Sequence, residues 1–133
     1  MSLSDPIVLS VDVANNNTPV AVNLARFREV TDETVYKLPS HTLSLRNLVA
    51  FSRTFPKQVG NFRGLARAKI VFTQDVTVVG VDGANIVAPF TFIVEARTPV
   101  GVSLGDQVSK RQHVISLLDN DALMEKFIGA LEI

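Results

Sequence analysis

Cysteine and tryptophan are absent from the 133-residue chain. Without thiols the chain can form no disulfide framework and no thiolate nucleophile, and it lacks the ligand that most structural zinc sites use. No stretch approaches the roughly 18 consecutive apolar residues that a membrane-spanning helix needs, so no membrane partner is expected. Met1 to Pro6 lacks the basic and apolar regions of a secretory signal, so we expect the protein to stay in the compartment where it is made.

Groups that carry out catalysis are also scarce. The sequence has two histidines, His41 and His113, and no phosphate-binding glycine loop, serine nucleophile elbow or metal-ligand cluster. Glu95 is the one carboxylate in a long apolar strand candidate and would be the general base of an enzyme. An ion pair with Arg97 or Arg67 is the plainer expectation for Glu95. We therefore predict that the chain is not an enzyme and needs no metal or cofactor.

Acidic residues are missing from the middle of the chain. The net charge is zero, with 13 basic and 13 acidic residues, yet every charged residue between Thr34 and Gln74 is basic. These are Lys37, Arg46, Arg53, Lys57, Arg63, Arg67 and Lys69. A local positive field attracts phosphate groups whatever the net charge is. The alternative is that these cations are scattered over a solvated surface.

Strand patterns come first in the sequence, and helix patterns come last. Alternation and β-branched residues predict strands at Pro6–Val13, Val20–Phe27, Thr34–Leu38, His41–Asn47, Leu65–Thr73 and Ile86–Arg97. Leu48–Phe62 is predicted as a long connection with room for a helical turn, and Asp82–Gly83 as a turn after the apolar segment Val76–Val81.

Helical periodicity begins after Pro99. Ser103 is a predicted N-cap, and the residues from Asp119 to Asp121 separate two helices that cover about 103–131. The strands before them cover about 6–97. The pattern predicts one α+β domain over residues 1–133, with an antiparallel sheet, an N-terminal hairpin and two C-terminal helices packed on one sheet face.

Alternation sorts the strand residues onto two faces of the predicted sheet. The apolar face is predicted to hold Leu43, Leu45, Ala66, Ala68, Ile70, Phe72, Phe90, Phe92, Val94 and Ala96. The other face is predicted to hold Thr42, Ser44, Arg46, Arg67, Lys69, Thr73, Thr91, Glu95 and Arg97. Hydroxyls beside cations suit RNA, because both bond to phosphate and sugar oxygens. An ordinary solvated face is an equally good explanation of this pattern.

The two predicted helices carry more apolar surface than one narrow sheet covers. Helices that reach across the sheet of a partner subunit would bury this surface. Two sheets joined edge to edge would also hide their exposed strands. The pattern therefore favours a homodimer.

The order and length of these elements resemble the coat proteins of single-stranded RNA bacteriophages of the levivirus type. The resemblance covers essentially the whole chain at the level of pattern. Its most specific segments are HTLSLRN (His41–Asn47), LARAKIVFT (Leu65–Thr73) and FTFIVEARTP (Phe90–Pro99), with a helix after them.

The resemblance implies an icosahedral shell built from interlocked dimers, assembled in the cytoplasm of a bacterial host and found in the virion. It implies that the interior sheet face binds genomic RNA and represses translation through an RNA hairpin. The implied RNA-facing residues are Thr42, Ser44, Arg46, Arg67, Lys69, Thr91, Ile93 and Glu95. The loop Val76–Ile86, with Gly80, Asp82 and Gly83, would make contacts between dimers.

Two other functions stay open at this point. A small α+β domain or enzyme could bind an apolar ligand in a cup between sheet and helices, lined by Phe90 and Phe92. A free RNA-binding regulator would share the basic face but would stop at the dimer.

Overall fold

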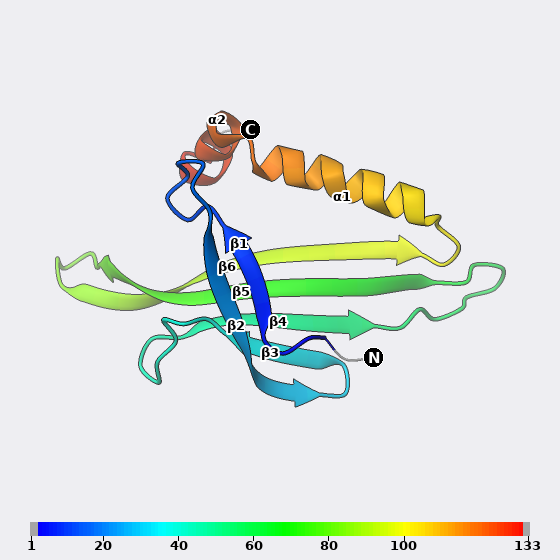
Figure 1. The fold of residues 1–133 in the computed structure, drawn as a ribbon, viewed down its shortest axis with the longest axis horizontal. Helices are drawn as coiled ribbons and strands as arrows, with labels where there is room; N and C mark the ends of the chain where they lie inside the picture. Colours follow the sequence, from blue (N-terminus) through cyan, green and yellow to red (C-terminus); the bar gives the residue numbers. More distant parts are fainter. Residues whose placement is uncertain (1–2, 132–133) are drawn as a thin grey trace. The chain divides into compact units, whose positions relative to one another are not determined.

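The computed structural model describes residues 3–131, which fall into two compact units. The first unit ends at Thr98 and the second begins at Pro99. The first unit is a six-stranded antiparallel sheet whose strands follow one another in chain order (Figure 1). The second unit contains the helices. Strands followed by helices confirm the predicted α+β class.

The sheet is a simple meander in which each strand pairs with its neighbours in the chain. Its strands are β1 (Ile7–Val11), β2 (Val20–Val30), β3 (Glu33–Lys37), β4 (Asn47–Thr54), β5 (Leu65–Val79) and β6 (Asn85–Pro99). The N-terminal hairpin, β3 and β6 lie where the sequence predicts them. β5 continues six residues beyond the predicted end at Thr73, because the β-branched run 76–79 favours a strand.

The fourth strand contradicts the sequence-based prediction. His41–Asn47 is not a strand before its last residue; within it, the backbone N–H of Thr42 donates to the carbonyl oxygen of Leu45 across a tight turn (2.9 Å). Leu43, predicted in the apolar core, is fully exposed at the tip of this turn. The strand is instead β4, inside the predicted connection Leu48–Phe62, and the true connection is the shorter loop 55–64.

A bulge in β2 lets one strand serve two pairings. The first half of β2 pairs with β1, and the second half pairs with β3. Phe27 is the extra residue of the bulge, next to Arg26, which pairs with Tyr36. The segment before β1 is tied to both strands: Arg26 N–H donates to Asp5 Oδ1 (3.0 Å), and the Tyr36 hydroxyl donates to the Ser4 carbonyl (2.8 Å).

The buried core of the described residues is small and lies on β2, β3 and β4. Leu24, Tyr36 and Val49 are at most 1 % exposed, and Val35 is 6 % exposed. Tyr36 packs edge-on against Phe51, with ring centroids 5.5 Å apart. Most other large apolar side chains of the described residues are exposed in the single chain. Such an apolar surface is typical of a subunit that assembles with others.

Leu24→Ala is expected to destabilise the protein by about 3 kcal/mol, because it removes buried methyl groups and leaves a cavity. Leu43→Ala is the matched control: its side chain is fully exposed, and the expected change is within about 0.5 kcal/mol. Urea denaturation at equal protein concentration measures both. Equal losses for the two variants would contradict this assignment of the core.

The second unit consists of a long helix, a short helix and a π-helical turn. In α1 (Leu104–Leu118) the Ser103 hydroxyl accepts from the Asp106 N–H (3.1 Å), which confirms the predicted N-cap. The Asn120 side chain caps α2 (Asp121–Met124), and η1 (Glu125–Gly129) follows directly. No described residue of these helices is buried. Packing of the helices on the sheet of a partner therefore remains a prediction.

Candidate nucleic-acid interface

The strand register places two predicted RNA-facing cations together on one face of the sheet. Arg67 and Lys69 lie two residues apart on β5, opposite Thr54 and Ser52 of β4. Residues paired in this way point to the same side of a sheet. The hydroxyl-bearing β4 residues were missed by the sequence analysis because β4 itself was missed. Two cations beside two hydroxyls form a surface that can donate to phosphate oxygens.

Glu95 of β6 joins this cluster and partly neutralises it. Its Oε1 lies 2.6 Å from Arg97 Nε and 3.9 Å from Arg67 Nε. The hydrogen bond from Arg97 lowers the pKa of the Glu95 carboxyl, and the charges of Arg97, Arg67 and Lys69 lower it further. We call Arg67, Lys69, Arg97 and Glu95 the basic cluster. Three cations and one carboxylate leave it with an excess of positive charge, and Glu95 takes its predicted place as an ion-pair partner.

The rest of this face is less polar than the sequence predicts. In the next cross-strand row Val35, Ala50 and Val71 lie side by side on β3, β4 and β5. Val35 is buried, and the other two are half-buried. This face therefore carries an apolar stripe beside the basic cluster, and the row beyond the stripe contains Lys37 and Thr73.

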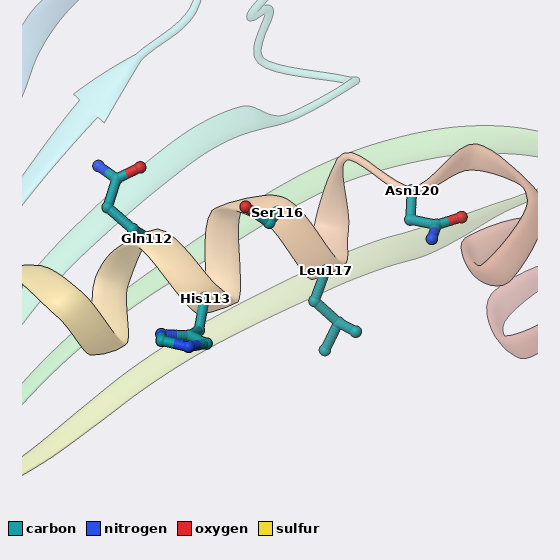
Figure 2. A pocket seen from close by; sticks show the side chains of 5 residues that line it. All are labelled: Gln112, His113, Ser116, Leu117 and Asn120. Atoms are coloured by element: carbon teal, nitrogen blue, oxygen red, sulfur yellow. The ribbon is translucent and has the colours of Figure 1, made fainter.

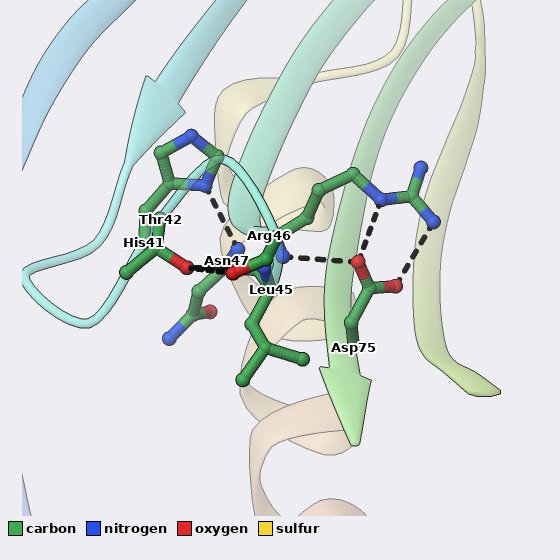
Figure 3. A network of polar contacts seen from close by, with 7 residues as sticks. His41, Thr42, Leu45, Arg46, Asn47 and Asp75 are labelled. Atoms are coloured by element: carbon green, nitrogen blue, oxygen red, sulfur yellow. Dashed lines mark hydrogen bonds and ion pairs between the residues drawn. The ribbon is translucent and has the colours of Figure 1, made fainter. Parts of the chain in front are cut away.

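Thr42 and Ser44, two predicted RNA contacts, do not lie on a strand. The Thr42 hydroxyl accepts from the Leu45 N–H (3.0 Å) and helps to close the turn before β4 (Figure 3). The Ser44 hydroxyl lies 3.4 Å from the Thr42 hydroxyl. The Asn47 N–H donates to His41 Nδ1 (3.1 Å) and fixes the other side of this turn. These side chains stabilise a local structure and are not aligned with the basic cluster.

Arg46 is held by a carboxylate that the sequence analysis did not identify. Asp75 of β5 accepts three hydrogen bonds from Arg46, one each from the backbone N–H, Nε and Nη2, all 2.9 Å long (Figure 3). The side-chain bonds from Arg46 are the main cause that lowers the pKa of Asp75 and raises that of Arg46. The guanidinium of Arg46 is therefore less available for phosphate than those of the basic cluster.

The lowered pKa of Asp75 predicts a loss of stability in acid. The contribution of this pair is complete above the ordinary aspartate pKa of about 3.9 and disappears as pH falls through the lower, folded-state value. We expect Asp75→Asn to lower the melting temperature at pH 7, with a difference that shrinks below about pH 4. Melting curves between pH 3 and 7 test this. A difference that does not change with pH would mean that the charge of Asp75 contributes nothing.

The remaining predicted site residues lie on β6 and in the turn before it. Thr91, Ile93 and Glu95 alternate along one side of β6, as predicted, and Thr91 and Ile93 are exposed. Three hydrogen bonds close the turn: Gly80 N–H to Ala84 O (2.7 Å), Gly83 N–H to Gly80 O (3.0 Å) and Ala84 N–H to Asp82 Oδ1 (3.0 Å). This confirms a turn at Asp82–Gly83, while contacts between dimers remain a prediction.

The second unit has a surface depression of its own. A shallow depression at the end of α1 is lined by Gln112, His113, Ser116, Leu117 and Asn120. Figure 2 shows that Gln112 extends from one side of the helix and that His113 and Leu117 extend from the opposite side, so no cluster of polar groups converges. Within residues 3–131 no cluster of metal ligands occurs, and no helix is long and apolar enough to span a membrane.

Comparison with known proteins shows that this fold is similar to the folds of subunits of phage virus-like particles. No protein-family model matches the chain, and no curated protein is significantly similar to it in sequence. Among solved structures, the virus-like particle of Wenzhou levi-like virus 4 is 21% identical with a TM-score of 0.71, covering 93% of this chain and 84% of that one. The virus-like particle of bacteriophage ESE058 is 13% identical with a TM-score of 0.71 and 99% of both chains covered.

A further match is the bacteriophage EMS014 coat protein. It is 13% identical with a TM-score of 0.62, and the match covers 88% of this chain and 74% of that one. At these identities the likeness shows the fold. It confirms that the chain has the fold of the coat proteins that its sequence pattern resembles.

Proposed function

We propose that this chain is the coat protein of a single-stranded RNA phage and that it forms an icosahedral shell from dimers. The observation that carries the proposal is the likeness of fold over nearly the full length of proteins that form virus-like particles. A capsid role is structural, so the proposal includes no enzymatic activity. Its location would be the virion, after assembly in the bacterial cytoplasm.

Two features of the single chain support a dimer. β6 lies at an edge of the sheet and is 15 residues long. Long exposed edge strands are normally paired or covered, and β6 of a second copy would extend the sheet. The helices also expose apolar side chains, including Leu117, Phe127 and Ile128. Packing against a partner's sheet would bury them.

The basic cluster supports RNA as the partner inside the shell. Arg67, Lys69 and Arg97 form a positively charged group on an open sheet face, where unpaired bases and phosphates can both reach the strands. We propose Thr91, which lies on the same side of β6 as Glu95, as a further RNA contact. We give less importance to RNA contacts by Arg46, Thr42 and Ser44, because each of these side chains already makes contacts within the chain. As its most specific part, the proposal includes repression of translation by binding to a genomic RNA hairpin.

One experiment tests the core of this function. The full chain, expressed in bacteria, is passed over a size-exclusion column with light-scattering and absorbance detection at 260 and 280 nm. We expect particles of megadalton mass that contain nucleic acid and appear as shells in electron micrographs. A dimer that binds RNA without forming shells would indicate a free regulator. A small species without nucleic acid would indicate the ligand-binding alternative.

A further inference from the structure

The loop 55–64, which connects β4 to β5, is not used by the proposed function above. We propose that this loop is a separate contact site for single-stranded nucleic acid. In this site the exposed ring of Phe62 stacks on a base, and Lys57 and Arg63 contact the neighbouring phosphates. Figure 1 shows the loop beyond the ends of β4 and β5, at the opposite end from the β5–β6 turn.

The loop has a fixed backbone. Val59 and Phe62 exchange two backbone hydrogen bonds, 2.9 and 3.0 Å long, and the Gln58 side chain donates to the Gly60 carbonyl (3.2 Å). Gly64 is buried and lies so close to the backbone of Lys57 that a Cβ there would come within 2.5 Å of the carbonyl oxygen. A loop that is ordered before binding loses little conformational entropy when a ligand arrives.

The loop exposes apolar and aromatic side chains that the chain itself does not cover. Phe55, Val59 and Phe62 are between 50 % and 68 % exposed. The guanidinium of Arg53 already lies over the Phe55 ring, 4.9 Å from its centroid, so this ring has one face occupied. Phe62 forms no such contact among the described residues and is the better stacking platform.

The charged residues of the loop itself are all positive. Lys57 and Arg63 are exposed, and neither forms an ion pair within the part of the chain that the structure describes. No acidic residue occurs between Thr34 and Gln74. Exposed rings among unpaired cations are the features that bind single strands without sequence preference, because every base has a face to stack and every nucleotide has a phosphate.

A surface of a second protein copy would fit this loop less well. It would have to cover the apolar rings and also supply carboxylates for Lys57 and Arg63. A single strand of RNA supplies both kinds of group in each nucleotide. The loop also begins directly after Thr54, which pairs with Arg67 of the basic cluster, so one strand could pass from the cluster to the loop.

Binding of a fluorescent 20-nucleotide oligouridylate to the full chain, freed of co-purified nucleic acid, tests the proposal by anisotropy. We expect Phe62→Leu to weaken binding about tenfold and Phe62→Trp to retain it, because Leu keeps apolar bulk and Trp keeps a ring. Lys57→Ala with Arg63→Ala should reduce the slope of log affinity against log salt by about 1.4, for two lost phosphate contacts. Lys110→Ala with Arg111→Ala, on α1, is the charge-matched control and should leave the slope unchanged.

Ultraviolet crosslinking followed by mass spectrometry locates the contact. The tryptic peptide Gln58–Arg63 contains Phe62, and we expect uridine adducts on it. Wild-type affinity in Phe62→Leu together with no adduct on this peptide would overturn the proposal. A Phe62→Leu variant that binds RNA normally but forms smaller assemblies would indicate a protein–protein contact, and this too would overturn it. The result is independent of the capsid proposal, because oligonucleotide binding by this loop is measured whether or not shells form.

Discussion

Arg67→Ala together with Lys69→Ala is expected to lower the affinity of the protein for single-stranded RNA by about tenfold or more near 150 mM salt. Both cations lie on the same side of β5, and Arg67 shares the Glu95 carboxylate with Arg97. Each lost phosphate contact should also reduce the salt dependence by about 0.7 in the slope of log affinity against log salt. Particles formed by the double variant should carry less nucleic acid, seen as a lower ratio of absorbance at 260 to 280 nm.

Glu95→Gln gives a control with the opposite sign. This carboxylate binds Arg97 and lies close to Arg67, so its neutral amide should leave both cations free and strengthen RNA binding. Arg46→Ala should have a smaller effect than the loss of Arg67 and Lys69, because its guanidinium is already paired with Asp75. If Arg46→Ala weakened RNA binding as much as the double variant does, RNA would have to displace the contact between Arg46 and Asp75. If the double variant fails to fold, the two cations are part of the structure and the assignment of the faces is wrong.

The long strands could be predicted because their two faces differ in chemistry. Along β5 and β6 apolar residues such as Ile70, Phe72 and Phe92 alternate with polar or charged ones, so period and faces are visible in the sequence. The cap of α1 at Ser103 could be predicted for a similarly local reason. The Ser103 hydroxyl accepts a hydrogen bond from the N–H of Asp106, only three residues further along the chain.

The strand β4 escaped prediction because its first half, 48–51, is apolar on both faces. Val49 is buried on one face, and Ala50 is part of the apolar stripe on the other, so successive residues show no alternation. The turn before it alternates by coincidence. Its leucines point into solvent, and the hydroxyl of Thr42 closes the turn instead of facing a ligand.

The partner of Arg46 could not be predicted because it depends on the register between two strands. Asp75 lies 29 residues further along the chain and directly follows the predicted basic stretch. Only the pairing of Asn47 with Gln74 brings the two side chains together. Local patterns therefore identified the cations, but the three-dimensional register decides which of them are paired with carboxylates.

Gly64→Ala is expected to destabilise the protein by about 3 kcal/mol or more and to lower the melting temperature by about 10 °C. Gly64 has a φ of 99°, and a Cβ there would lie 2.5–2.8 Å from three backbone atoms of Lys57, which cannot rotate away as a side chain would. Gly60→Ala, in the same loop, is the matched control: its φ is 61°, but nothing lies within 4 Å of the added Cβ. We expect this control to lose only about 1–2 kcal/mol, the usual cost of a left-handed alanine. Equal losses at both positions would show that the backbone conformation, and not the contact with Lys57, determines the shape of the loop.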